Sequence, residues 1–128
     1  MCIRDRINGE EETTMQIRVS DGTNSITFML NDSSAARSLY EQLPLTIDAQ
    51  NYSTNEKIFY PKDKLDTSNT PLASGGLGVL AYYEPWGDVV MFYGSFRENS
   101  SLYALGTAIT GTEMIENLSG EIMIEQIR

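Results

Sequence analysis

Two acidic residues, Glu84 and Asp88, flank the turn sequence Pro85-Trp86-Gly87, a spacing that could support acid–base chemistry. A pair of carboxyl groups can act as general acid and general base when their surroundings hold their pKa values apart. Acidic residues beside a tight turn more often lie at the surface without a chemical role. We therefore assign no catalytic residue from this pair.

A second charged pair, Glu56-Lys57, follows a turn and stands beside Tyr52, Phe59 and Tyr60. In a functional interpretation, the pair orients a polar ligand at the mouth of a barrel. In a structural interpretation, strand alternation sends the two side chains to opposite faces, one into solvent and one into an ion pair. The alternation favours the structural interpretation.

The residue types that are missing exclude several kinds of site. The 128 residues include no histidine, which excludes Ser-His-Asp and Cys-His nucleophile systems and the common His-ligated zinc and iron sites. The single cysteine, Cys2, allows neither an intrachain disulfide nor a thiolate metal cluster. We predict no metal and no cofactor. An enzyme is the less favoured class, because it would have to use carboxylates, Tyr, Lys, Ser or Thr, or a borrowed cofactor.

The net charge of the chain indicates which classes of partner it can bind. Eighteen acidic and nine basic residues give a net charge of −9, which repels phosphate backbones, so we predict no nucleic-acid binding. No apolar run approaches the roughly 20 residues that span a bilayer, and we predict no transmembrane segment. A peptide or a small molecule remains as partner, and the oligomeric state stays open.

The N-terminal residues differ in character from the rest. The stretch Met1–Arg6 lacks the apolar region of a signal peptide and resembles the translation of a transposase adapter used in sequencing libraries. Residues 7–14 are polar and acidic, and we expect a disordered lead-in. If they are the tether behind a lost lipoprotein signal, the protein is extracytoplasmic and lipid-anchored, which is our expectation. If Met15 is the true start, the protein is cytoplasmic. The folded domain is predicted over 15–128.

Hydrophobic periodicity predicts many short strands and two helices. Strands are expected at 16–20, 25–30, 45–49, 56–60, 77–83, 89–93, 102–109 and 121–127. A helix is expected from Ser33 to Leu43, ended by Pro44, and a short helical turn from Thr112 to Leu118. Long loops are expected at 61–76 and 94–101. This pattern favours a mostly antiparallel barrel or sandwich with helical plugs.

The segment from Tyr82 to Gly94 predicts an aromatic hairpin, with the only Trp and three of the seven Tyr. Gly87 can adopt the left-handed conformation that its turn requires. Alternation sends one of Tyr82 and Tyr83 inward and the other outward, and this marks a core or a pocket wall. In the strand 102–109, Gly106 predicts a bulge or a close approach of two backbones.

Several of these segments together resemble the bacterial cyclophilin-like domain family, small proteins of mostly unknown function. The resemblance runs through Ser33–Leu39, Leu43-Pro44-Leu45, Tyr52, Asn55-Glu56-Lys57, Tyr82–Gly87 with Phe92-Tyr93, and Leu105-Gly106. It implies a mostly β fold with two short helices, closed into a largely antiparallel barrel. True peptidyl-prolyl isomerases carry a Phe-His-Arg strand, which this chain lacks. The resemblance therefore supplies no catalytic residue.

Together these observations favour a non-enzymatic module that binds a peptide or small ligand at an aromatic-lined barrel mouth. The candidate binding residues are Glu56, Lys57, Tyr83, Trp86, Tyr93 and Arg97. One alternative is a peptidyl-prolyl isomerase, or another enzyme, with a non-standard site. A further alternative is a structural domain of an exported lipoprotein.

Overall fold

A computed structural model describes residues 15–52 and 55–127 of the chain. The adapter remnant and the polar lead-in expected over 1–14 lie outside the described residues. The strands are β1 (Gln16–Ser20), β2 (Ser25–Leu30), β3 (Leu45–Tyr52), β4 (Glu56–Phe59), β5 (Val79–Tyr83), β6 (Asp88–Phe92), β7 (Leu102–Thr110) and β8 (Gly120–Ile127). The helices are α1 (Ser34–Glu41) and the 3-10 helix η1 (Thr112–Asn117).

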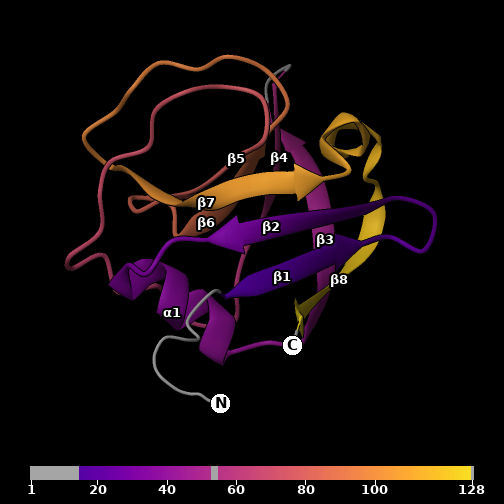
Figure 1. Cartoon of the computed structure of the whole chain (residues 1–128), viewed down its shortest axis with the longest axis horizontal. Coiled ribbons are helices and arrows are strands. Elements are labelled where there is room, and N and C mark those ends of the chain that lie inside the picture. Colours follow the sequence, from indigo (N-terminus) through magenta and orange to yellow (C-terminus); the bar gives the residue numbers. More distant parts are fainter. Residues whose placement is uncertain (1–14, 53–54, 128) are drawn as a thin grey trace.

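The strands close into one barrel in the order β1-β2-β7-β5-β6-β4-β3-β8 (Figure 1). Every neighbouring pair is antiparallel, and β8 closes the ring between β1 and β3. The predicted closed antiparallel barrel with two short helices is confirmed. Because each strand has a neighbour on both sides, the barrel presents no open edge for pairing with another chain.

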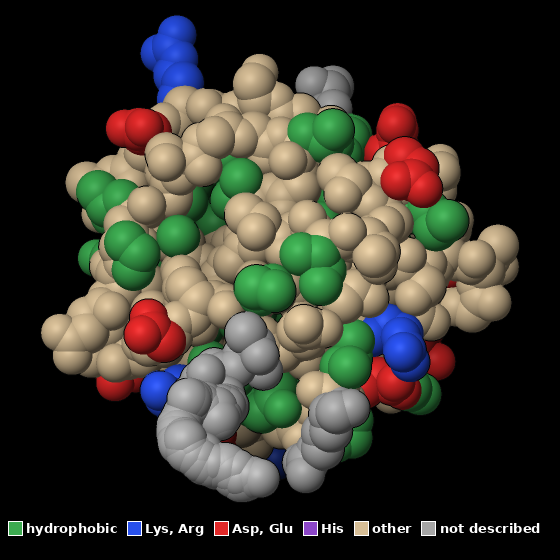
Figure 2. Space-filling view, viewed as in Figure 1, with side chains coloured by type: hydrophobic (Ala, Val, Ile, Leu, Met, Phe, Trp, Pro, Cys, Tyr) green, Lys and Arg blue, Asp and Glu red, His purple; other side chains and the backbone are tan. Residues whose placement is uncertain are grey.

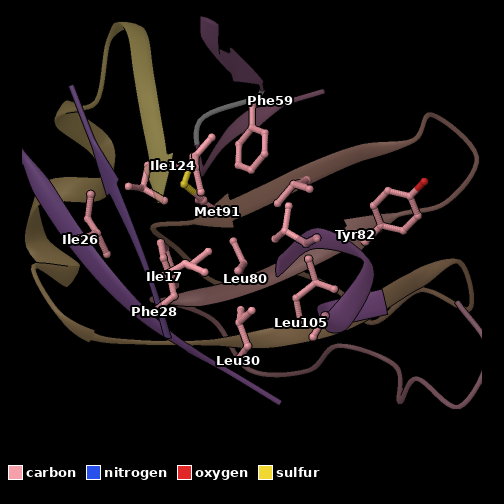
Figure 3. Packing of buried hydrophobic residues seen from close by; sticks show 14 of the residues in the cluster. Ile17, Ile26, Phe28, Leu30, Phe59, Leu80, Tyr82, Met91, Leu105 and Ile124 are labelled. Carbon is pink, nitrogen blue, oxygen red and sulfur yellow. The ribbon is translucent and has the colours of Figure 1, made fainter. Parts of the chain in front are cut away.

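Alternate side chains of the strands fill the barrel interior. Phe28, Leu80, Met91 and Ile124 come from four different strands and point into the same core (Figure 3). At one end of the barrel, α1 adds its buried face, Ala35, Ala36 and Leu39, to this core. At the opposite end, η1 adds Ile115. The two helices therefore act as plugs, as the sequence pattern predicted.

The helix α1 begins at the predicted position, with Ser33 as its N-cap, but it ends at Glu41, two residues before the predicted Leu43. The hydroxyl of Ser33 accepts a hydrogen bond from the amide of Ala36 at 3.2 Å, which satisfies one free donor of the first turn. The chain leaves the helix at Gln42, two residues before Pro44. Gln42 also bonds the backbone of Asp63 in both directions, which ties the loop after β4 to the helix. Among the described residues, no helix is long and apolar enough to cross a bilayer.

Gly106 lies where two backbones meet. A methyl group on its Cα would overlap the carbonyl oxygen of Met29 in β2. The register between β5 and β7 also shifts beside this position, between Leu80 and Ala81. The predicted close approach and bulge are both confirmed.

One part of the barrel wall is buried on its outer side as well. Ile58, Ala81, Val90, Phe92 and Leu102 form a second apolar cluster outside the barrel, on β4, β5, β6 and β7. The loops 60–78 and 93–101 pass over this side of the sheet (Figure 1), and Phe96 of the second loop packs against the cluster. Because both faces are covered, all five residues of β6 are buried. This covered outer wall is the setting of the candidate site.

The face of the molecule drawn in Figure 2 is mixed in charge. Figure 2 shows Lys and Arg side chains as separate positions among acidic, apolar and other polar ones. On the face in that view, the two signs of charge are therefore interspersed rather than segregated.

Candidate functional site

The β5–β6 hairpin places the first residues of the site. Tyr83 pairs with Asp88, and Gly87 adopts a positive φ of 72° and donates its amide to the Tyr83 carbonyl at 2.9 Å. The predicted turn is confirmed. Strand alternation then sets Asp88, Val90 and Phe92 on the outer wall, while Val89 and Met91 face the core.

The register between β4 and β6 brings in a second carboxylate. Glu56 lies opposite Phe92 and therefore shares the outer face with Asp88. A cavity of about 330 Å³ opens between this face and the loop 93–101. Its lining residues are Asn55, Glu56, Tyr83, Trp86, Asp88, Val90, Phe92, Phe96, Arg97, Asn99 and Leu102.

Two aromatic pairs shape the cavity. Phe92 of β6 and Phe96 of the loop are stacked, with ring centroids 3.9 Å apart and planes inclined by 14°. Tyr83 and Trp86 meet edge to face at 5.6 Å and 77°. Trp86 remains 47% exposed, so its ring lies at the rim rather than in the core. Stacked and edge-on rings of this kind offer apolar surface to a ligand.

The loop over the cavity is held to β4 by Asn55. Its side-chain amide donates to the Ser95 carbonyl at 2.8 Å, and its own carbonyl accepts from the Tyr93 amide at 2.9 Å. These two bonds fix the start of the loop that carries Phe96 and Arg97. The loop side of the cavity is therefore held in place by hydrogen bonds to β4.

Asp88 is the most unusual polar group of the site. It is only 2% exposed, and its Oδ1 has no hydrogen-bond partner among the described residues. Burial raises the pKa of Asp88 to about 6, although its own backbone amide opposes the rise. The pKa of Glu56 is also raised, first by burial and then by the negative charge of Asp88. The two carboxyl groups are therefore close enough to influence each other, and each resists ionisation.

Arg97 lines the same cavity but leaves these carboxylates uncompensated. Its side chain is exposed on the loop. Within the described part of the chain, no ion pair joins Arg97 to Glu56 or Asp88. The cavity thus has two acidic lining residues and one cationic lining residue, and the cation pairs with neither carboxylate in the described structure.

The structure brings four of the six predicted binding residues together: Glu56, Tyr83, Trp86 and Arg97. Lys57 and Tyr93 lie elsewhere, because alternation turns both toward the barrel interior. Lys57 is 5% exposed and pairs with the core residue Met91, and Tyr93 packs against the inner core. Four of the six residues therefore line a cavity on the outer wall of the barrel rather than a barrel mouth, and the other two face the interior.

The predicted separation of Glu56 and Lys57 onto opposite faces is confirmed, but neither side chain has the expected surroundings. Glu56 lines a cavity instead of facing open solvent. Lys57 is buried, and burial lowers its pKa, while the charges of Glu116 and Asp21 partly offset the fall. No ion pair within 4 Å joins Lys57 to another described residue.

The carboxylate pair differs from the one that the sequence suggested. Glu84 is exposed in the turn, whereas Asp88 belongs to β6 and faces Glu56 across the outer wall. Because side chains two apart on a strand share a face, Asp88 lies on the same covered face as Val90 and Phe92. Its pairing with Glu56 needed the β4–β6 register, which no local pattern in the sequence specifies.

Comparison with known proteins agrees with the architecture. The sequence profile of a family described as "Cyclophilin-like family" matches residues 19–125. The solution structure of a hypothetical protein from Archaeoglobus fulgidus is similar, with a TM-score of 0.75 and 17% sequence identity over 94% of this chain and 100% of that chain. No curated protein gives a significant sequence match. At this identity, the structural likeness establishes the fold alone.

Proposed function

The chain belongs to the Cyclophilin-like family, and from this premise we propose that it is a binding module that takes a small ligand, or one side chain of a peptide, into the cavity on its outer wall. A shared fold does not specify a function, so the proposal depends on the cavity and not on the family.

The observation that carries the proposal is a supported cavity that combines aromatic surface with a buried, unpartnered acceptor. Its volume of about 330 Å³ is at the lower end of the range for ligand pockets, which suits a single ring with a short side chain. The stacked Phe92 and Phe96 supply apolar contact, and the Oδ1 of Asp88 supplies a directional hydrogen bond. Apolar area gives affinity in such sites, and a few polar groups fix orientation.

Fragment binding followed by two-dimensional amide NMR tests this function. We expect small aromatic fragments to shift the signals of 55–56, 83–92 and 94–99 together, because these segments surround the cavity. Phe96→Ala removes one of the stacked rings and should abolish these shifts. Ile109→Ala, which alters an exposed side chain outside the cavity, is the matched control. Fragments that bind only at other surfaces would contradict the proposal.

A second candidate function, acid–base catalysis, is favoured by the raised pKa values of Glu56 and Asp88. The isomerase form of this alternative can be tested in a coupled proline-isomerisation assay of the full chain. Acceleration above background that is lost in Asp88→Asn and kept in Glu84→Gln would establish catalysis at this cavity. The uncatalysed rate in all three proteins would leave binding as the function of the cavity.

A further inference from the structure

The Oδ1 of Asp88 is the strongest sign of what the cavity accepts. It is an acceptor inside a covered wall, it lines the cavity, and no described residue donates to it. Buried polar groups in native proteins nearly always have a hydrogen-bond partner, so an unpartnered acceptor in a cavity wall calls for an explanation. A donor on the occupant of the cavity would supply the missing hydrogen bond.

The charges around this acceptor favour one kind of hydrogen-bond donor over others. Glu56 shares the cavity with Asp88, and the negative charge of Asp88 adds to burial in raising the pKa of Glu56. Arg97 forms no ion pair with either residue in the described structure. A neutral donor would satisfy one hydrogen bond and leave the repulsion between the carboxylates in place, whereas a cation relieves both. An anionic occupant would add to the repulsion.

The other lining residues favour an organic cation over a metal ion. Among the described residues, no group of three or more Asp, Glu or Cys side chains is placed to hold a metal, while calcium requires six to eight oxygen ligands. The cavity instead has four aromatic rings, from Tyr83, Trp86, Phe92 and Phe96. Aromatic faces attract ammonium groups and also pack against the apolar part of the same molecule.

We propose that the occupant carries a protonated amine on a compact apolar or aromatic body, with the amine between Glu56 and Asp88 and the body against the aromatic rings. This inference rests on the proposed binding function and names the chemical class of its ligand. A free amine and a lysine side chain of a peptide share this chemistry.

Three probes of similar shape and different charge test the inference: 2-phenylethylamine, 2-phenylethanol and 3-phenylpropanoate. Binding is followed by Trp86 fluorescence and amide NMR at pH 7.5 in 0.15 M salt, which screens the general attraction of an acidic protein for cations. We expect the amine to bind about tenfold more tightly than the alcohol, since charged hydrogen bonds are the stronger ones, and the carboxylate to bind most weakly.

Two isosteric variants and one control test whether the preference for the amine over the alcohol arises at Glu56 and Asp88. Asp88→Asn and Glu56→Gln each remove one charge of the pair, so the preference for amine over alcohol should fall to about twofold. Glu84→Gln removes the same charge from the exposed turn and should keep the full preference. The preference should also increase from pH 5 to pH 8, as the carboxyl groups ionise.

The source of the amine is distinguished by a blocked dipeptide, acetyl-Phe-Lys-amide, compared with its norleucine analogue. Lysine-dependent binding at the cavity supports the proposal with a peptide as the source, and selective binding of 2-phenylethylamine alone supports it with a small molecule.

The failure of this inference is separable from the failure of the proposed function. If the alcohol binds at the cavity as tightly as the amine, or if the amine preference survives in both Asp88→Asn and Glu56→Gln, the amine inference is overturned and the binding function stands. If none of the probes shifts the cavity signals, both are overturned.

Discussion

Burial disfavours the charged form of Asp88, and this should be visible in the pH dependence of the free energy of unfolding. Its pKa is about 6 in the folded protein and 3.8 as an ordinary carboxyl group. Between these values the folded state holds more protons than the unfolded chain, so the stability that protonated Asp88 contributes is lost as pH rises through this window. Linkage puts the total loss at about 3 kcal/mol, with about half of it above pH 5.

Asp88→Asn keeps the side chain neutral at every pH and should remove this loss. Relative to Glu84→Gln, which changes the net charge equally from an exposed position, Asp88→Asn should gain about 1.5 kcal/mol of unfolding free energy between pH 5 and pH 8. Urea titrations of both variants and the parent at several pH values measure the difference. Parallel stability curves for the two variants would show that Asp88 ionises normally in the fold.

Lys57 presents the opposite sign of charge in the barrel interior. Burial lowers its pKa, so the folded state releases its proton at lower pH than the unfolded chain does. Stability should therefore rise as pH increases from the folded pKa toward 10.5. Lys57→Met removes the charge while keeping much of the side-chain length.

Lys57→Met should leave stability unchanged or raise it by about 1 kcal/mol at pH 7, because an apolar side chain needs no hydration in the core. The variant should also lose the rise in stability at alkaline pH. Lys62→Met, at an exposed position, is the control in the same urea titrations. A loss of stability in Lys57→Met alone would mean that attraction to Glu116 and Asp21 outweighs the effect of burial.

At the scale of elements, α1 depends on its contact with the barrel core more than on its own propensity. A helix of eight residues is too short to persist alone in water, so its packing must stabilise it. Leu39 is fully buried against the core, whereas Arg37 on the same helix is exposed. Leu39→Ala should lower the unfolding free energy by about 3 kcal/mol, and Arg37→Ala by less than about 0.5 kcal/mol. Equal and small losses in urea titrations would show that α1 does not close the barrel.

Periodicity predicts the bounds of most strands to within one residue. β1 and β2 have the predicted bounds, and Ser33, which lies at the predicted start of the helix, caps α1. β3 continues to Tyr52, beyond the predicted Ala49, because its backbone continues to pair with β4. The sequence of these last residues shows no hydrophobic alternation that would have indicated a strand. β5 starts at Val79 rather than Leu77, since Gly78 has a positive φ of 90°.

The candidate site was less accessible to sequence reasoning than the elements that carry it. Alternation correctly separated Tyr82 from Tyr83 and Glu56 from Lys57. The burial of the outer wall depends on loops without periodicity, and the approach of Glu56 to Asp88 depends on strand register. Register and loop cover are tertiary properties, so the sequence pointed to several residues of the cavity without locating it on the wall.

At the scale of the whole molecule, closure of the ring makes stability a shared property of all strands. β8, the last strand, pairs with β1 on one side and with β3 on the other, so it closes the gap between these two strands (Figure 1). Its inward residues Ile122 and Ile124 belong to the central core. Loss of β8 would open two strand edges and a gap in the core together.

Two truncations test which segments the closed barrel requires. All strands of the ring lie between Gln16 and Ile127. A protein of residues 15–128 should therefore unfold cooperatively in urea within about 0.5 kcal/mol of the full chain. A protein ending at residue 119 lacks β8 and should show neither the far-ultraviolet circular dichroism of the barrel nor a cooperative transition. A large loss of stability in 15–128 would instead assign residues 1–14 a part in the fold, and retained cooperativity without β8 would mean that the remaining strands fold without closing.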